Sequence, residues 1–253
     1  MPTRLYVISL SNPSAAGAAM LGYKGVAHRV VRLPLAVHPM LVRLAGFPGW
    51  TVPALEIGGR KVQGTLEISR SLDELRPDPP LFPRDAESRA RVEEAELWGE
   101  RELQPVPRRI IRLAALNDPG LRRWLAAEVM GTPVPRLTAA LAKPMVRRLA
   151  AVSKAEEAVV REDVRRLPEL LNRADALLAE GTIGTPAPNA ADFQILATVR
   201  VLLEFESLVH LAAGRPSEAA ARRLYPRWTG PIPRTPLLDQ LSEGSEGIVA
   251  SRR

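Results

Sequence analysis

The chain has 253 residues, of which 46% are hydrophobic and 25% charged, and both fractions are ordinary for a folded globular protein. This length suits one large domain or two smaller ones with real hydrophobic cores, so disorder over most of the chain is excluded. No uncharged apolar run reaches the roughly 18 residues that a spanning helix needs, and the N-terminal residues make a poor signal peptide. We therefore expect a cytoplasmic protein with no membrane partner.

Cysteine is absent and histidine occurs only three times. Disulfides, Cys-ligated zinc, iron–sulfur clusters and thiol nucleophiles are therefore excluded. The histidines His28, His38 and His210 are scattered without a metal-ligand spacing. We predict no metal site.

The formal net charge is +7, with 35 basic and 28 acidic residues. A basic balance can indicate a nucleic-acid partner. Aromatic residues are only 4%, however, and Arg is interleaved with Glu and Asp in segments such as 88–96 and 155–166. This pattern favours solvated helix faces with salt bridges over nucleic-acid binding.

The first 75 residues alternate between strand-like and helix-like segments. Residues 4–9 are β-branched and aromatic, which is typical of a strand, and Asn12-Pro13 then gives an N-cap with Pro at the first helical position. Gly58-Gly59 is a hairpin signal. The expected elements are a strand at 4–9, a helix at 14–23, a strand at 28–33, a helix at 35–45, strands at 52–57 and 61–63, and a helix at 66–75.

This β-α-β-α-β-β-α order predicts how the strands pair. A strand–helix–strand start implies a parallel pair, and the later hairpin adds antiparallel pairing. Residues 77–84 contain four prolines and cannot form a regular helix or a central strand, so we interpret them as an interdomain linker.

Beyond residue 84 no strand pattern is found. We expect a long amphipathic helix at 87–116, bent or broken at Pro105 and Pro107, and an irregular tail after Trp228. Further helical regions are expected at 121–149 (interrupted by Pro133, Pro135 and Pro144), 154–180, 190–213 and 216–224. The fold class predicted is α/β plus all-α: a thioredoxin-like domain at 1–76, the linker at 77–84, and an all-helical bundle at 85–253.

Val52-Pro53 interrupts a strand pattern, where Pro removes a ladder donor. A cis bond here would turn the Val52 N–H and C=O toward an extended peptide, as in strand addition. The alternative is an ordinary trans Pro at a strand start. We predict the cis bond.

Gly64-Thr65 follows the hairpin and opens a helix. A hydroxyl residue at a helix start caps orphan N–H groups, and that helix start is also an anion site. Thr65 could therefore hold a carboxylate, or it merely caps its own helix.

Ser11 lies in the loop after the first strand, just before a helix N-terminus. A hydroxyl beside helix N–H donors can donate to a thiolate and lower the pKa of the thiol. The alternative is a capping loop without chemistry, and Ser14, one turn further on, is the rival hydroxyl.

Asn189 and Asp192 have the spacing of a capping box at the start of an apolar helix. We expect the Asp192 carboxylate to accept from the Asn189 backbone N–H. This is a folding element, and we assign it no chemistry.

Together these segments resemble the soluble glutathione transferase superfamily, in its Ser- or Cys-type members. Segment 52–72 is similar to the family's Val-Pro-Ala-Leu strand, hairpin and helix start, segment 189–193 to its Ser/Thr-x-x-Asp capping box, and segment 5–25 to its first strand and helix. The resemblance covers most of the chain and is weak between 120 and 180.

The resemblance implies a glutathione site and a catalytic role. Glutathione, as co-substrate, would pair its cysteinyl backbone with Val52 beside Pro53. Thr65 and Gly64 at the helix start would hold the γ-glutamyl carboxylate, and Ser11 would stabilise the thiolate. The thiolate would attack a small apolar electrophile bound against the helical domain. A homodimer and a role in detoxification are also implied.

Two positions depart from the family pattern. Gly64 stands where many members have an acidic residue or Gln, and Gly17-Ala18 where many have a basic residue. These departures leave two alternatives to a transferase: a glutathione-dependent isomerase or dehalogenase, and a non-catalytic binding or scaffold protein. For Trp98, Ile110 and Ile111 we weigh a place in the electrophile site against a place in the core, and favour the core.

Overall fold

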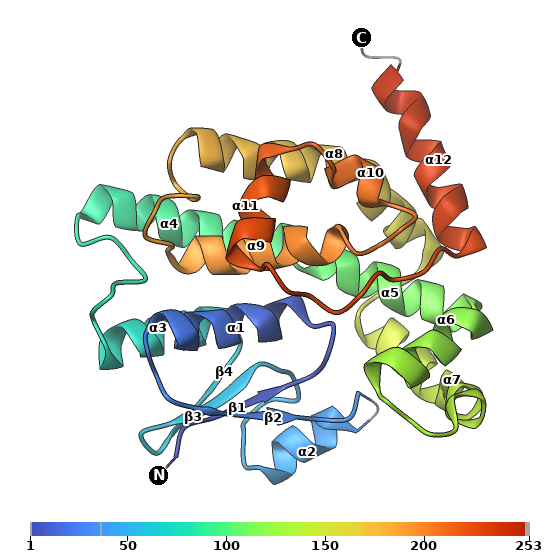
Figure 1. Ribbon diagram of the computed structural model, residues 1–253, viewed down its shortest axis with the longest axis horizontal. Helices are drawn as coiled ribbons and strands as arrows, with labels where there is room; N and C mark the ends of the chain where they lie inside the picture. The colour runs from blue at the N-terminus through green and yellow to red at the C-terminus, as the bar shows by residue number, and fades with distance from the viewer. Residues whose placement is uncertain (1, 36, 251–253) are drawn as a thin grey trace.

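The computed structural model describes residues 2–35 and 37–250 (Figure 1). The N-terminal elements are β1 Arg4–Val7, α1 Asn12–Tyr23, β2 Arg29–Arg32, α2 His38–Leu44, β3 Ala54–Ile57, β4 Arg60–Gln63 and α3 Thr65–Leu75. The helical elements are α4 Ala86–Trp98, η1 Gly99–Leu103, α5 Pro105–Asn117, α6 Pro119–Trp124, η2 Leu125–Val129, α7 Pro135–Val152, α8 Glu157–Ala179, α9 Ala190–Leu202, α10 Val209–Ala212, α11 Pro216–Leu224 and α12 Pro236–Ala250.

The four strands form one mixed sheet in the order β2-β1-β3-β4. Strand β1 runs parallel to β2, with Leu5 opposite Val30, and antiparallel to β3, with Leu5 also opposite Leu55. Strands β3 and β4 form the antiparallel hairpin. The predicted element order and the predicted pairing are both confirmed.

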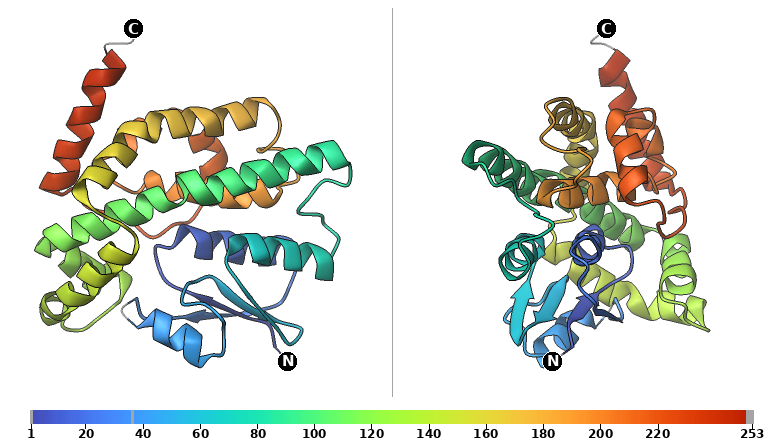
Figure 2. Two further views of the ribbon diagram at one scale, coloured as in Figure 1. Left: turned by 180° about the vertical axis from the view of Figure 1, so that it is seen from behind. Right: turned by 60° about the vertical axis from the view of Figure 1, so that its left-hand side comes forward.

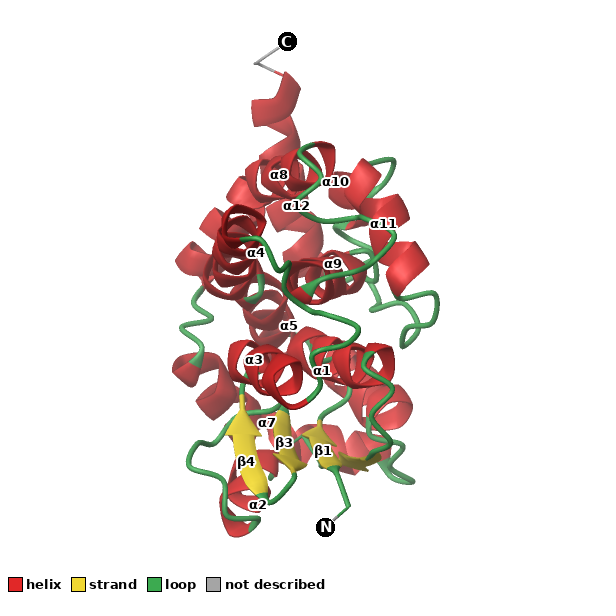
Figure 3. Ribbon diagram, turned by 90° about the vertical axis from the view of Figure 1, so that its left-hand side faces the viewer, coloured by secondary structure: helices red, strands yellow, loops and turns green. Residues whose placement is uncertain are grey.

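Helices cover both faces of this sheet (Figure 3). Helices α1 and α3 lie between the sheet and the helical domain, and α2 covers the opposite face (Figure 1). The apolar residues of β1 and β3 alternate between these faces, as the period of a strand requires. The first face shares one core with α1 and α3, and the second packs a small cluster of Val42, Phe47 and Ala54. This arrangement is a thioredoxin-like domain followed by an all-helical domain.

Helix α9 is the centre of the helical domain (Figure 2). Every residue from Ala190 to Leu202 is buried, because α9 packs against α1 on one side and against α4 and α11 on others. Its N-terminus carries the predicted capping box: the Asn189 N–H donates to Asp192 Oδ2 at 2.9 Å, and the Asp192 N–H donates to Asn189 Oδ1 at 3.2 Å.

The proline-rich segment 77–84 is packed against both domains. Leu81 is fully buried; its N–H donates to Asp73 Oδ1 at 2.7 Å, and its carbonyl accepts from the Ala190 N–H at 2.9 Å. The same Asp73 oxygen receives the buried Lys24 ammonium at 2.7 Å. We propose that segment 77–84 separates the two domains of the folded chain and holds them together through these contacts.

Three expectations for the helical domain are wrong. Segment 229–253 is not wholly irregular, because α12 begins at Pro236, where the Leu238 N–H donates to Thr235 Oγ1 at 3.3 Å and Leu238 is buried. Pro144 does not interrupt α7, which runs through it. The helix expected at 190–213 ends at Leu202 and is followed by turns and the short α10.

The long helix expected at 87–116 is not broken, because helical backbone continues through Pro105 and Pro107. The π-helical segment η1 links α4 to α5, and Pro105 takes the first position of α5, where its missing N–H costs least. Its exposed face carries ion pairs such as Arg91 with Glu87 and Arg89 with Glu93, as expected from the charge pattern. In the part of the chain that the structure describes, no helix combines the length and apolar character needed to cross a membrane.

Candidate functional site

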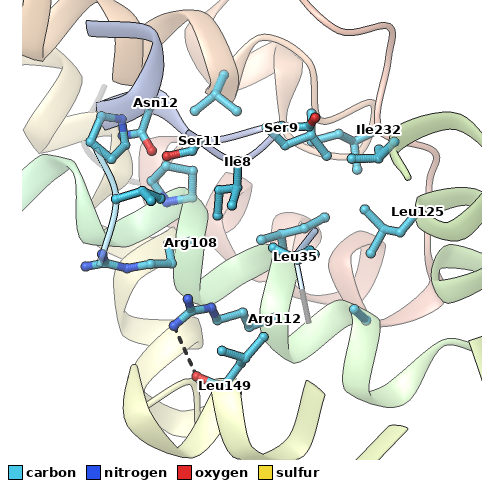
Figure 4. Close-up of a pocket in the computed structure, with 18 of the residues that line it drawn as sticks. Ile8, Ser9, Ser11, Asn12, Leu35, Arg108, Arg112, Leu125, Leu149 and Ile232 are labelled. Atoms are coloured by element: carbon cyan, nitrogen blue, oxygen red, sulfur yellow. Dashed lines mark hydrogen bonds between the residues drawn. The ribbon is translucent and has the colours of Figure 1, made fainter. Parts of the chain in front are cut away.

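A cavity of about 140 Å³ lies between the α/β domain and the helical domain (Figure 4). We call it the interdomain cavity. One wall comes from the β1–α1 loop, the start of α2 and the segment before β3, and the other from α5, η2 and α7. Its residues are Ile8–Pro13, Leu35, His38, Thr51, Val52, Pro107, Arg108, Ile111, Arg112, Ala115, Leu125, Val129, Val146, Leu149, Val201, Phe205 and Ile232.

Ser11 lines this cavity as the N-cap of α1. Its Oγ accepts from the Ser14 N–H at 3.2 Å. The hydroxyl proton donates to no other described residue, so it is available to an acceptor in the cavity. The preceding residue, Leu10, has a φ of 58°, a conformation that non-glycine residues rarely adopt and that turns the chain sharply from β1 into α1.

Val52 lines the same cavity, and the predicted cis bond between Val52 and Pro53 is confirmed. No backbone hydrogen bond joins Val52 to another described residue. Its N–H and C=O are therefore free to pair with an extended ligand. Pro53 itself is buried, and a Cβ built on Gly17 would come within 3.4 Å of the Pro53 Cβ, so a small residue at 17 lets α1 pack closely against this bend.

Gly64 and Thr65 lie beside Pro53 but do not line the interdomain cavity. The Gly64 N–H donates to the Pro53 carbonyl at 2.9 Å, and Gly64 has a φ of 90°, which favours glycine. No side chain caps the start of α3, so the reading of Thr65 as a cap of its own helix is wrong. Thr65 is buried and its hydroxyl donates to Glu100 Oε2 at 3.4 Å.

Glu100 is a site neighbour that the sequence alone did not indicate. It lies in η1 and also accepts from Gln194 Nε2 at 2.8 Å. Burial raises the pKa of Glu100, and the charge of Arg108 and the hydrogen bonds from Thr65 and Gln194 act in the opposite direction. The Glu100 carboxyl group lies beside the start of α3 through its hydrogen bond with Thr65, where an ammonium group would favour its ionised form.

Two arginines on α5, Arg108 and Arg112, also line the cavity and were not among the predicted site residues. Their spacing of four residues on an amphipathic helix is the only sequence signal for a shared face. Arg112 Nη1 donates to the Leu149 carbonyl at 3.1 Å (Figure 4). Burial, together with the charge of Arg108, lowers the pKa of Arg112 to about 10, so Arg112 remains charged at neutral pH.

His38 faces the arginines from α2. Its Nδ1 lies 2.7 Å from the Leu35 carbonyl. Burial is the main cause that lowers the pKa of His38, and the charge of Arg112 acts in the same direction. His38 is therefore neutral at pH 7 and adds no charge to the cavity.

The apolar candidates divide between core and cavity. Ile110 is fully buried and Trp98 packs against the main core, as expected, whereas Ile111 lines the interdomain cavity. Ile111, Ala115 and Leu149 give the helical wall an apolar surface. The cavity thus combines a free hydroxyl, a free peptide backbone, an apolar wall and two cationic side chains.

Ser14 takes a different position from Ser11. It is buried, its Oγ has no partner among the described residues, and it lines a second hollow that it shares with Ser11, Arg227 and Trp228. Ser14 does not line the interdomain cavity. Among the described residues, no group of three His, Cys, Asp or Glu side chains could hold a metal ion.

Comparison with known proteins agrees with this architecture. Residues 5–80 match the family model described as "Glutathione S-transferase, N-terminal domain". A search of curated protein sequences finds no match.

Solved structures similar to this chain include glutathione transferase F7 from Populus trichocarpa (16% identity, TM-score 0.58, covering 96% of this chain and 99% of that one). They also include the beta-etherase LigF from Sphingobium sp. strain SYK-6 (21%, 0.58, 97% and 100%) and FzlA from C. crescentus (19%, 0.54, 95% and 99%). The match to the family model covers the N-terminal domain, and the whole chain shares the two-domain fold of these glutathione transferase-like structures.

Proposed function

We propose that this protein binds glutathione along the α/β domain, with the thiol in the interdomain cavity and the γ-glutamyl group at the start of α3, and uses its thiolate to conjugate or otherwise transform a small apolar electrophile. One observation carries the proposal: the Ser11 hydroxyl and the unpaired Val52 backbone line the same cavity, opposite the apolar wall of α5. A cytoplasmic homodimer acting in detoxification belongs to the same proposal.

In this proposal the tripeptide lies along the α/β domain. Its cysteinyl N–H and C=O pair with the Val52 backbone as an added strand would. The γ-glutamyl carboxylate takes the uncapped start of α3 at Gly64 and Thr65. Glu100, beside Thr65, then faces the γ-glutamyl ammonium, so both charges of that group meet complementary partners.

Ser11 acts on the sulfur. A free thiol has a pKa above neutral, so most of it is unreactive at pH 7. A hydroxyl donor at the start of α1 stabilises the anion and not the thiol, which lowers that pKa. The thiolate then forms a carbon–sulfur bond at the electrophilic carbon, and the leaving group departs with the bonding electron pair. Rate enhancement comes from positioning and pKa lowering.

Two alternatives have support of their own. The fold shared with a beta-etherase supports a related glutathione-dependent reaction, such as an isomerisation or a dehalogenation. A non-catalytic binding or scaffold role is supported by the Thr65 hydroxyl, which already donates to Glu100, and by the missing side chain at Gly64.

Binding and turnover of the purified protein test the proposal. We expect retention on immobilised glutathione with release by free glutathione, and conjugation of chlorodinitrobenzene above the uncatalysed rate. Thr65→Val removes the hydroxyl with little change in volume and should raise the KM for glutathione several-fold at unchanged fold. Retention without turnover of any electrophile would favour the scaffold role. The absence of both retention and turnover would refute glutathione use.

A further inference from the structure

Helix α5 carries three arginines with contrasting environments. Arg109 points away from the interdomain cavity and forms a two-pronged ion pair with Asp163, at 2.5 Å and 2.7 Å. Arg108 and Arg112 line the cavity, and in the described part of the chain no carboxylate lies within ion-pair distance of either. The fold therefore supplies an ion-pair partner for Arg109 and none, among the described residues, for Arg108 or Arg112.

Of the two cavity arginines, Arg108 has the clearer lack of a hydrogen-bond partner. Its Nε is buried and has no hydrogen-bond partner. Arg112 donates one hydrogen bond, to the Leu149 carbonyl. A buried guanidinium N–H without an acceptor costs free energy. A ligand acceptor that enters the cavity would form the missing hydrogen bond and recover that free energy.

Among the residues that the structure describes, no acidic residue lines the interdomain cavity to balance these charges. Glu100 acts on Arg108 through space, but its carboxylate is hydrogen-bonded to Thr65 and Gln194 outside the cavity. Two like charges four residues apart on a helix also repel each other. Figure 4 shows both side chains extending toward the same side of the cavity, below Ser11.

We propose that Arg108 and Arg112 together bind an oxyanion of the second substrate, so that the electrophile is an apolar molecule carrying a carboxylate or sulfonate. The identification of the ligand as an electrophile rests on the proposed function, but the oxyanion site itself does not depend on catalysis. The planar fork of Arg suits such a group, and the neighbouring Ile111, Ala115 and Leu149 suit its apolar body.

Glutathione also carries carboxylates, so the source of the oxyanion has to be separated experimentally. The α/β domain supplies the features proposed for the tripeptide, namely the Val52 backbone and the start of α3. The two arginines come from the opposite wall, on the helix that supplies the apolar surface. This placement assigns them to the second substrate.

A matched dye pair tests the site without turnover. Anilinonaphthalene sulfonate and the neutral N-phenylnaphthylamine share one apolar body and differ by the sulfonate. We expect the wild-type protein to prefer the anion, and Arg108→Met and Arg112→Met each to reduce that preference roughly tenfold or more, because a charge-assisted hydrogen bond is lost. Arg148→Met, an exposed arginine on α7, is the control and should keep the preference.

A substrate pair tests the assignment to the electrophile. Chlorodinitrobenzoate and the corresponding chlorodinitrobenzamide both lose chloride as the carbon–sulfur bond forms, and each rate is divided by its uncatalysed rate. We expect the wild type to favour the benzoate in kcat/KM, and the Met variants at 108 and 112 to lose that preference with little change in the KM for glutathione.

Each outcome separates the two proposals. If the wild type conjugates neither compound, the proposed function fails, and the dyes still decide the oxyanion site. If the Met variants raise the KM for glutathione equally with both electrophiles, the arginines serve the tripeptide and the inference is overturned. An unchanged dye preference also overturns it. Should a variant fail to fold, displacement of the bound sulfonate dye from wild type by benzoate but not by benzamide supports the site, and equal displacement refutes it.

Discussion

The contact region between the two domains differs at its two ends. At the end formed by the linker, which we call the closed end, polar groups are buried with their partners. Lys24 meets Asp73, Leu81 bonds to both domains, and Glu96 accepts from Ser69 Oγ at 2.6 Å and from Arg70 Nη1 at 2.7 Å. The bonds of Glu96 and Leu81 hold the α/β domain against the helical domain, and the Lys24 ammonium binds the same Asp73 carboxylate that receives the Leu81 N–H.

The end that contains the interdomain cavity, the open end, has the opposite character. The Ser11 proton, the Val52 backbone and the Arg108 Nε all lack partners there among the described residues. Buried polar groups in a folded protein normally have hydrogen-bond partners within the protein. The contrast teaches that the closed end serves stability, whereas the unsatisfied groups of the open end await a ligand.

The largest effect is expected at the closed end, from Asp73→Ala. This change leaves the buried Lys24 ammonium without its carboxylate and should lower the free energy of unfolding by about 3–5 kcal/mol. The matched control is Glu74→Ala on the same helix, because the Arg60–Glu74 pair is exposed and should be worth at most about 1 kcal/mol. Urea unfolding measures both, and equal losses would remove the distinction between the pairs.

Glu96 gives the closed end a pH dependence. Burial raises the pKa of Glu96 from 4.5 to about 7 in the folded protein, against the hydrogen bonds and charge that favour the anion. Between these values the folded state binds more protons than the unfolded state, so stability falls as the pH rises through this window. Each pKa unit corresponds to about 1.4 kcal/mol.

Glu96→Gln should abolish this dependence. We expect the stability of the variant, relative to wild type, to rise by about 3 kcal/mol between pH 4.5 and pH 7.5. Burial also raises the pKa of Asp192, to about 6, but that contribution cancels in the difference between the two proteins. The exposed Glu94→Gln is the control. A difference that stays flat with pH would show that folding does not raise the pKa of Glu96.

At the open end, Ser11→Ala should reduce turnover, and it should also cost about 1 kcal/mol of stability because Ser11 is the N-cap of α1. Loss of one hydroxyl donor to the thiolate should raise the thiol pKa by one to two units and lower the rate roughly ten- to hundred-fold, with little change in the KM for glutathione. Rates followed from pH 6 to pH 9 show the shift.

Ser14→Ala is the control for Ser11, because Ser14 lines only the second hollow. It should keep the wild-type rate and pH profile. Loss of activity in Ser14→Ala but not in Ser11→Ala would transfer the role to Ser14. No change in either would favour the non-catalytic alternative.

The smallest effect concerns the capping box at the closed end. Asp192→Ala leaves the N–H groups of Asn189 and Gly184 without the acceptor that they have at 2.9 Å and 2.6 Å, and should cost about 1–2 kcal/mol. Asp192→Asn keeps one oxygen and should cost less. Thermal unfolding of the three proteins distinguishes them, and an unchanged melting temperature in Asp192→Ala would contradict the role of the box.

Local sequence patterns were sufficient for much of the fold. The strand and helix order of the first 75 residues, the capping box at Asn189 and the cis bond before Pro53 all follow from interactions within a few residues. Alternating apolar residues, a cap three residues from its acceptor and a Pro inside a strand pattern leave signals that survive without knowledge of the rest of the chain. The same patterns placed Ser11 and Val52 among the candidate site residues.

Other features depended on contacts between distant segments. The tail was expected to be irregular because it is rich in Pro, Gly and Ser. Helix α12 forms there because Leu238 is buried in the core. The proline-rich linker is ordered because Asp73 and Ala190, which are far apart in sequence, both bond to Leu81.

The roles of the α5 arginines were likewise decided by the tertiary structure. Arg108, Arg109 and Arg112 look alike in sequence, and only the position of Asp163 on another helix distinguishes the paired arginine from the two in the cavity. The sequence determined which elements form in the first 75 residues and where helix α9 begins, because those choices are local. Which polar groups are satisfied and which face a ligand was determined by packing, because a partner can come from any part of the chain.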